Sequence, residues 1–467
     1  MYHHFNTKRR FALRVTSYIL MTLAVIIGVV FVTAWIMGWR FDTESQEIKQ
    51  ISLVHVQSFP AGARVDINGE RQSFVTPGRL EVAAGPIEVK LSLKGYQDWV
   101  KKVDLKATEV RWLNYARLIP KEIKTTNISN LGSVSDISPS PNKKWAVASI
   151  SPAGRNFKLI NLNNPSNVEV TDMVVPTVIR GETFSILGWD KGSEFLLMSN
   201  NYGDIIRLDR RDIRNSINLS IELKQTITTA RFSDNANMVY GIINGNLHRL
   251  NVSEKTVSDS LVKKIKSFSI YEDKIVYVAT PIDGQQEVGV LRDGKTTTIK
   301  TFKDDLATVA VFSYYYYRDH VTISHGDEIL VIRNPFAEKP DILKKLKFDG
   351  GISFLEVSFN GRFVLAWNGG RTLIYDIETD ETFRFNTINP TGPPKWLDDY
   401  HLTYIVDGNI TTDIIEKTVA MTDFDGANKY QLVSGRGTPI LSGNQQFLFS
   451  IVDTAEGTIL QRSNLTL

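Results

Sequence analysis

The longest uninterrupted apolar segment of the chain is close to its N-terminus, where the 25 residues from Val15 to Trp39 carry no charge. As a helix this segment would be about 37 Å long at ~1.5 Å per residue, enough to cross a bilayer. The basic residues before it are Lys8, Arg9, Arg10 and Arg14. Because the basic side of a membrane helix stays in the cytoplasm, we expect a cytoplasmic tail over 1–14, a transmembrane helix over 15–39, a linker over 40–50 and extracytoplasmic domains beyond.

Two other interpretations of the apolar segment remain open. Val32-Thr33-Ala34 has small residues that suit a cleaved signal peptide, although the run exceeds the ~7–15 apolar residues of such peptides and continues past Ala34. The core helix of a soluble protein would need a polar face, which this segment lacks. Trp35 and Trp39 suit the outer membrane interface. A membrane anchor is therefore the main expectation.

Residues 51–119 alternate between apolar and polar positions over short stretches, which predicts strands separated by Pro and Gly turns. Asn68-Gly69 indicates a hairpin, because both central residues of a type I′ turn need positive φ. The predicted strands are Leu53–Ser58, Ala63–Asn68, Ile87–Leu93 and Val100–Leu105.

The order of short motifs in this β region resembles the PEGA domain family. The matching residues are Ser58-Phe59-Pro60-Ala61-Gly62-Ala63, Val65-Asp66-Ile67-Asn68-Gly69, Thr76-Pro77, Gly85-Pro86-Ile87-Glu88-Val89 and Lys94-Gly95-Tyr96. Before Thr76 the chain departs from the pattern, since Ser73-Phe74-Val75 replaces the commoner glycine-containing turn. The resemblance implies a small β-sandwich that acts as a spacer or interaction module in envelope proteins, without catalytic residues.

From residue 121 to residue 467 the chain repeats an all-β unit of about 39–50 residues, a period typical of propellers and solenoids. Each unit has an inner strand, a polar turn and an apolar second strand, with no helical stretch between units, which favours a β-propeller. The inner strands are predicted to start near Val134, Phe184, Thr228, Ser267, Thr308, Ser353, Pro394 and Thr438. Eight blades are therefore favoured, with seven as the alternative.

The last unit has room for only three strands, Thr438–Leu441, Gln446–Val452 and Thr458–Gln461. We expect Ile123–Leu131 to supply the fourth, which would close the ring and remove the open sheet edge. The turn pattern and the segment Met421–Asn428 resemble TolB-type and WD-repeat-like propellers. That resemblance implies a fold and a binding habit, and it does not identify a ligand.

The amino-acid composition excludes several classes of partner and of chemistry. The fractions of 42% hydrophobic and 22% charged residues are those of folded domains rather than disordered chains. A net charge of +3 over 467 residues indicates no nucleic-acid partner, since the basic tail already accounts for part of it. The absence of cysteine excludes disulfides, thiolate metal sites and a thiol nucleophile. An extracytoplasmic chain without disulfides favours a bacterial envelope location.

Two short patterns suggest catalysis, but both have a simpler explanation as turns. Gly289–Thr296 fits the phosphate-binding loop expression, yet a β-branched alternating run follows it where a helix is required. Ser140 and Lys143, with Ser233-Asp234-Asn235, resemble part of the penicillin-binding enzyme motifs, but the Lys-Thr-Gly element is missing. Both fragments also fall in the same turn of different repeats. We expect neither to be catalytic.

The candidate metal ligands are similarly weak. His320 and His325 are five residues apart, a spacing that sends strand side chains to opposite faces. Asp423, Asp425 and Asn428 lack the complete loop and terminal bidentate Glu of a calcium-binding hand. We therefore expect no metal and no cofactor.

The candidate binding residues are Tyr314, Tyr315, Tyr316, Tyr317 and Arg318. Four consecutive aromatics cannot all face the core of one pleated strand, and exposed tyrosine beside arginine is typical of binding patches. Packing between blades with incidental exposure is the alternative explanation.

These features predict a single-pass envelope protein with non-catalytic binding or scaffolding by the propeller as its function. Its partners would be the lipid bilayer, through residues 15–39, and an envelope protein or glycan. An extracytoplasmic hydrolase acting on a glycan or peptide is the alternative function. A signal-relaying sensor is disfavoured because the expected tail of about 14 residues is too short for an output domain.

Overall fold

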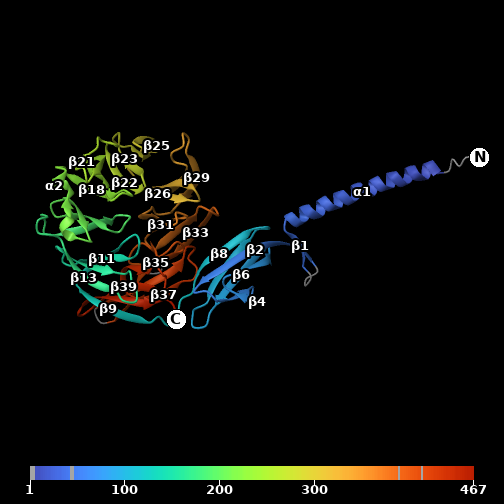
Figure 1. Cartoon of the computed structure of the whole chain (residues 1–467), viewed down its shortest axis with the longest axis horizontal. Helices are drawn as coiled ribbons and strands as arrows, with labels where there is room; N and C mark the ends of the chain where they lie inside the picture. Colours follow the sequence, from blue (N-terminus) through green and yellow to red (C-terminus); the bar gives the residue numbers. More distant parts are fainter. Residues whose placement is uncertain (1–5, 43–46, 388–389, 412–413) are drawn as a thin grey trace, which may run out of the picture. The chain divides into compact units, whose positions relative to one another are not determined.

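The computed structural model describes residues 6–42, 47–387, 390–411 and 414–467. The chain forms two compact units, Met1–Lys121 and Glu122–Leu467 (Figure 1). The first unit contains the long helix and a β-sandwich, and the second contains a ring of β-sheets. The division falls within a residue of the start predicted for the propeller.

Helix α1 (Asn6–Ile36) contains a 26-residue segment, Phe11–Ile36, that is long and apolar enough to cross a membrane. Its mean hydropathy is 2.7 and none of it is buried in the protein. The helix starts inside the segment expected to be the cytoplasmic tail, and it ends three residues before the predicted end at Trp39. Gly38 explains this end, because its φ of +80° is a left-handed conformation that stops a helix.

The segment expected to be a linker is instead mostly strand. β1 (Trp39–Asp42) pairs antiparallel with the beginning of β2 (Glu47–Phe59). The linker prediction for residues 40–50 is therefore wrong wherever the structure describes them. Alternating residues in Trp39–Phe41 and Ile48–Gln50 explain the pairing, since they follow the period-two pattern of a strand.

The β-sandwich that follows consists of two four-stranded sheets. One contains β1, β2, β5 (Gly78–Ala83) and β8 (Val110–Arg117); the other has the order β4 (Glu70–Val75), β3 (Arg64–Ile67), β6 (Gly85–Ser92), β7 (Trp99–Leu105). Val54, Val65, Val89, Leu91 and Trp99 are fully buried between them. The four predicted strands overlap β2, β3, β6 and β7, whereas β4, β5 and β8 were not predicted.

The described residues of the second unit form eight four-stranded sheets, which we number as blades 1 to 8 (Figure 1). Blades 1 to 4 are β10 (Val134–Pro139), β11 (Trp145–Ile150), β12 (Asn156–Asn161), β13 (Glu169–Val174); β14 (Phe184–Trp189), β15 (Phe195–Asn200), β16 (Ile205–Asp209), β17 (Ile217–Asn218); β18 (Ile227–Phe232), β19 (Met238–Ile243), β20 (Asn246–Asn251), β21 (Thr256–Val257); and β22 (Ile265–Tyr271), β23 (Lys274–Ala279), β24 (Gln286–Arg292), β25 (Lys295–Phe302).

Blades 5 to 8 are β26 (Thr308–Tyr315), β27 (Arg318–His325), β28 (Glu328–Arg333), β29 (Asp341–Lys347); β30 (Phe354–Val357), β31 (Phe363–Asn368), β32 (Arg371–Asp376), β33 (Glu381–Asn386); β34 (Lys395–Trp396), β35 (His401–Thr411), β36 (Ile414–Asp423), β37 (Tyr430–Ser434); and β38 (Arg436–Leu441), β39 (Phe447–Thr454), β40 (Gly457–Asn464), β9 (Thr125–Gly132). Short helices η1 (Ile213–Asn215) and α2 (Leu219–Glu222) lie in blade 2. Every predicted inner-strand start is within two residues of the first strand of a blade.

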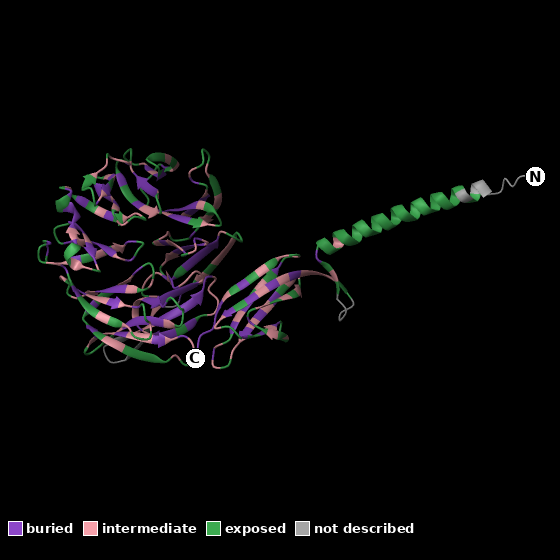
Figure 2. Cartoon of the chain, viewed as in Figure 1, coloured by how far each residue is buried: buried purple, intermediate pink, exposed green. Residues whose placement is uncertain are grey.

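The ring closes as expected from the sequence, because β9 pairs antiparallel with β40, at the opposite end of the unit. First strands of neighbouring blades contact each other, for example β22 with β26 and β10 with β38, so the first strand of each blade is innermost. Apolar side chains of the middle strands fill the space between blades, as with Val321 and Ile323 of blade 5 against Val288 of blade 4. Figure 2 shows this buried interior as purple strands. The all-β propeller with one long N-terminal helix agrees with the predicted fold class.

Candidate binding surfaces

The turns between first and second strands gather at one end of the ring. All eight blades have the same antiparallel strand order, so their first turns lie at the same end. Ion pairs between successive blades confirm that neighbouring turns are close: Lys191 of blade 2 pairs with Asp234 of blade 3 at 2.6 Å, and Lys274 of blade 4 pairs with Asp319 of blade 5 at 2.9 Å. We call this end the turn rim, defined by the eight turns that join β10, β14, β18, β22, β26, β30, β34 and β38 to the strands that follow them.

The tyrosine run forms the turn of blade 5 on this rim. Tyr316 and Tyr317 join β26 to β27, with φ values of +48° and +60°. Two consecutive left-handed residues define a type I′ hairpin turn. Their side chains are 76% and 86% exposed, and Arg318 is also exposed. This part of the predicted patch therefore does face solvent.

The same turn geometry occurs elsewhere with the residues that normally adopt it. The pairs Asn68-Gly69, Asn244-Gly245, Asp293-Gly294 and Gly369-Gly370 all have two consecutive positive φ angles at hairpins. A tyrosine in this region is strained, because its Cβ approaches the following carbonyl, at about 1–2 kcal/mol per residue. Tyr316-Tyr317 departs from the sequence preference of its own turn type, and such departures concentrate at functional sites.

The other two tyrosines are held by neighbouring blades. The Tyr314 ring stacks on Tyr271 of blade 4, with ring centroids 6.1 Å apart, and Lys274 lies 5.5 Å from the ring centre. Tyr315 is half-buried beside Glu378 of blade 6. Burial, followed by the hydrogen bond to the Glu378 carboxylate, raises the pKa of Tyr315. These two tyrosines therefore support the turn, and packing between blades describes them better than a binding role does.

Blade 6 supports the turn from its other side. Arg362 makes a two-point ion pair with the buried Asp376, at 2.6 and 2.8 Å, and also pairs with Glu378. Gly361 has a φ of +78°, and a Cβ there would be only 2.3 Å from the Tyr314 carbonyl oxygen. The blade 6 turn therefore packs directly on β26. It carries Phe359, which is 64% exposed, on the same rim.

Ser140 and Lys143 have structural roles in the blade 1 turn. The Ser140 hydroxyl donates to Asn142 Oδ1 at 2.8 Å and accepts the Trp145 N–H at 3.1 Å. The same serine and asparagine pair recurs at Ser358 with Asn360 and at Ser442 with Asn444. Lys143 Nζ donates to the Leu397 carbonyl at 3.1 Å. Repetition of the bonds in three blades accounts for the serine without catalysis.

The residues of the remaining sequence motifs also lie in turns or make packing contacts. Asp293-Gly294, inside the phosphate-loop-like pattern, is a hairpin turn with φ values of +52° and +75°. His320 is buried, which lowers its pKa, while His325 contacts Asp304 at 2.9 Å and stacks on Phe302. Asp423 accepts from Asn428 within its own turn at 2.8 Å. Within the described residues, no group of three His, Asp or Glu side chains is arranged to hold a metal.

A charged pair between the first strands of blades 6 and 7 was not predicted from the sequence. Glu356 of β30 lies 3.6 Å from Lys395 of β34, and Lys395 in turn lies over the Phe354 ring at 4.0 Å. Burial raises the pKa of Glu356, and Lys395 opposes this shift. Lys395 also lines a hollow of about 210 Å³ together with Asp136 of blade 1. Strand patterns reveal which residues share a face of a strand, but they do not reveal which side chains of neighbouring blades meet.

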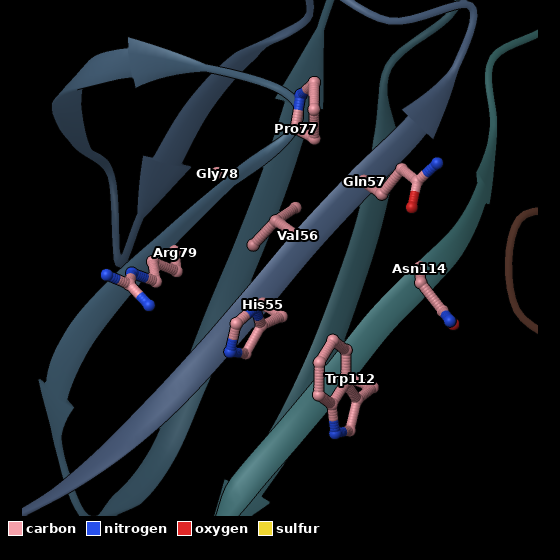
Figure 3. Close-up of a pocket in the computed structure, with 8 residues that line it drawn as sticks. All are labelled: His55, Val56, Gln57, Pro77, Gly78, Arg79, Trp112 and Asn114. Atoms are coloured by element: carbon pink, nitrogen blue, oxygen red, sulfur yellow. The ribbon is translucent and has the colours of Figure 1, made fainter.

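A second surface lies on the outer face of the sandwich, on the sheet formed by β2, β5 and β8 (Figure 3). The hollow has a volume of about 310 Å³ and includes Gln57, Arg79 and Asn114 in its lining. At its centre the rings of His55 and Trp112 stack with centroids 4.1 Å apart. Flat rings flanked by amide and guanidinium groups suit a planar or sugar ligand. The parallel pairing of β2 with β8 creates this site, and β8 was not predicted.

An eight-sheet propeller joined to a β-sandwich is the class of protein that this architecture defines. Residues 51–118 match the family model described as the PEGA domain, in agreement with the motif resemblance. The comparison with curated proteins found no match.

Solved structures with a similar fold include the Myceliophteria thermophila Cps50 (Swd1) β-propeller domain, at 10% identity and a TM-score of 0.42, covering 74% of this chain and 100% of that one. An oligogalacturonate lyase in complex with manganese has 10% identity and a TM-score of 0.41, with 74% and 98% covered. The oligogalacturonate lyase of Vibrio parahaemolyticus has 9% identity and a TM-score of 0.40, with 72% and 98% covered.

Proposed function

We propose that this chain is a membrane-anchored extracytoplasmic binding protein whose propeller captures an envelope protein or glycan at the turn rim, without catalysis. The observation that carries the proposal is the Tyr316-Tyr317 turn. Its two side chains are 76% and 86% exposed in a backbone conformation that tyrosine disfavours. Retaining strained aromatics in solvent has no benefit for folding, whereas rigid exposed rings favour binding.

The surrounding rim supports this role. Phe359 adds an exposed ring on the adjoining turn, and Arg318 adds a guanidinium group. Tyr315, Arg362 and Glu378 hold the base of the turn. A preorganised aromatic surface of this kind loses little side-chain entropy when a partner binds. The non-catalytic part of the proposal is supported by the structural roles found for Ser140, Lys143 and Asp293.

The proposed location rests on α1 and on the charges before it. A span of 26 residues with mean hydropathy 2.7 suits a membrane anchor. Lys8, Arg9 and Arg10 favour a cytoplasmic N-terminus by the positive-inside rule. The PEGA domain and the propeller would then lie outside the cytoplasm.

The test is crosslinking in cells that express the full chain, read by mass spectrometry of rim peptides. The variant Y316N/Y317G replaces the turn by the Asn-Gly pair found at residues 68 and 244. Its matched control is Y202S, because Tyr202 is 62% exposed but lies in a turn between second and third strands, at the other end of the ring. We expect crosslinks at the rim to disappear in Y316N/Y317G and to persist in Y202S. Identical crosslinks in all three proteins would contradict the proposal.

A further inference from the structure

The hairpin formed by β1 and the beginning of β2 has one apolar and one charged face. Trp39 is paired with Gln50 and Phe41 with Ile48, so these four side chains lie on one face. Arg40, paired with Lys49, lies on the other face. The exposed fractions of Trp39, Phe41 and Ile48 are 41%, 63% and 64%. The apolar face of this hairpin is thus unpartnered in the described part of the chain.

This apolar face is a continuation of the core-facing side of the sandwich. Ile48 has the same strand parity as Val54 and Val56, which are buried against the second sheet. The second sheet does not cover the hairpin, so Ile48 remains exposed where the pattern requires burial. Large apolar side chains in such a position indicate a further apolar environment.

The hairpin is tied directly to the end of α1. The Gly38 carbonyl accepts the Ile51 N–H at 2.9 Å, and a Cβ on Gly38 would be 2.7 Å from the Thr108 methyl group. Arg40 donates to the Trp35 carbonyl at 2.9 Å, and its guanidinium carbon lies 5.2 Å from the centre of the Trp35 ring. A cation at a helix C-terminus is favourable. The connection is therefore a fixed hydrogen-bonded junction.

Distance then limits where the apolar face can lie. Only Met37 and Gly38 separate α1 from β1. The four residues of β1 extend about 13 Å at ~3.3 Å per residue. If α1 crosses the bilayer, Trp39 and Phe41 lie within or next to the headgroup region, which is about 5–8 Å thick on each side. Tryptophan and phenylalanine are favoured at that depth.

We infer that the hairpin docks its Trp39, Phe41 and Ile48 face onto the lipid headgroup region of the membrane crossed by α1, and so fixes the PEGA domain at the bilayer surface. This inference rests on the proposed membrane anchor. Continuity with α1 selects lipid as the occupant. The charged face with Arg40 and Lys49 is turned towards water.

The test uses the full chain, in which the absence of cysteine makes each introduced cysteine unique. Single variants F41C, I48C and K49C carry an environment-sensitive fluorophore in liposomes of phosphatidylcholine and phosphatidylglycerol. Spin-labelled lipids act as quenchers either near the headgroup or near the acyl-chain end. We expect blue-shifted emission and headgroup-level quenching at F41C and I48C, and neither at K49C, which lies on the opposite face.

A fourth variant, V25C in the middle of α1, tests the membrane anchor separately from the docking of the hairpin. Quenching of V25C by the chain-end label, together with equal signals at F41C and K49C, would overturn hairpin docking and leave the anchor intact. An unquenched V25C would overturn both. Emission at F41C that is blue-shifted but unaffected by the headgroup quencher, and that rises with protein density, would place a second copy on this face and overturn lipid docking.

Discussion

Replacing Tyr316-Tyr317 by Asn-Gly should leave the propeller as stable as before, although it removes two aromatic residues. Removing the backbone strain of two left-handed tyrosines should raise the unfolding free energy by about 2 kcal/mol. The rings are 76% and 86% exposed. Since full burial of an aromatic side chain contributes ~2–3 kcal/mol, the buried fractions together account for about 1 kcal/mol. The extra freedom of glycine in the unfolded chain costs about 0.7 kcal/mol. The net change in unfolding free energy is therefore below about 1 kcal/mol.

The assay is urea unfolding of the full chain, followed by intrinsic fluorescence, for wild type, Y316N/Y317G and the reverse swap D293Y/G294Y. The reverse swap puts two tyrosines into a turn with φ values of +52° and +75°, where a Cβ on Gly294 meets no atom within 4 Å. Backbone strain opposes it by about 2 kcal/mol, and removing the freedom of glycine from the unfolded chain offsets about 0.7 kcal/mol of that. The exposed Arg292–Asp293 ion pair at 3.7 Å contributes little, so we expect a net loss of about 1–1.5 kcal/mol. If Y316N/Y317G loses 2 kcal/mol or more by the same scale, the tyrosines are structural and the argument for binding is refuted.

Three further predictions follow from buried polar groups and the sandwich surface. The hydrogen bond to Arg180 lowers the pKa of Asp204 from 3.8 to about 2, so D204N should lower the unfolding free energy in urea by about 1–2 kcal/mol at neutral pH. The difference in unfolding free energy between wild type and D204N should shrink as the pH falls from 4 towards 2. A difference that does not change with pH would contradict the ion-pair account. S358A should lose about 1–3 kcal/mol, because the Phe363 N–H that donates to Ser358 at 2.9 Å is left unsatisfied; an unchanged urea midpoint would contradict this. W112A should lose about 1–2 kcal/mol, since Trp112 is 55% exposed and its buried part and its ring stacking each contribute about 1 kcal/mol. A loss above about 3 kcal/mol, typical of core aromatic residues, would show that the outer face is part of the core.

Local patterns were sufficient to predict most of the fold. Alternating strands and polar turns identified the start of each blade, and the shortened last unit indicated that its fourth strand comes from the start of the propeller, now seen as β9 against β40. The predicted end of the helix was three residues too late, because the apolar run continues through Trp39 whereas the left-handed Gly38 ends α1 at Ile36. A positive φ at one glycine is not visible in an average over apolar residues.

The candidate site was predictable only in part. Four adjacent tyrosines implied exposure, but their division into two turn residues and two supporting residues depends on Tyr271 and Glu378 of neighbouring blades. The His55–Trp112 stack depends on a parallel strand pair separated by more than 50 positions in the chain. Sequence spacing carries no signal for such contacts, because loop closure brings together residues whose separation along the chain is arbitrary.

The most direct test of the central claim is labelling of single cysteines by a membrane-impermeant maleimide in spheroplasts that express the full chain. V178C reports on the propeller, since Val178 is 87% exposed, and T7C reports on the segment before the membrane span. The account predicts that V178C is labelled in intact spheroplasts and that T7C is labelled only after the membrane is permeabilised. Labelling of T7C with protection of V178C would place the propeller inside the cell and contradict the extracytoplasmic binding role.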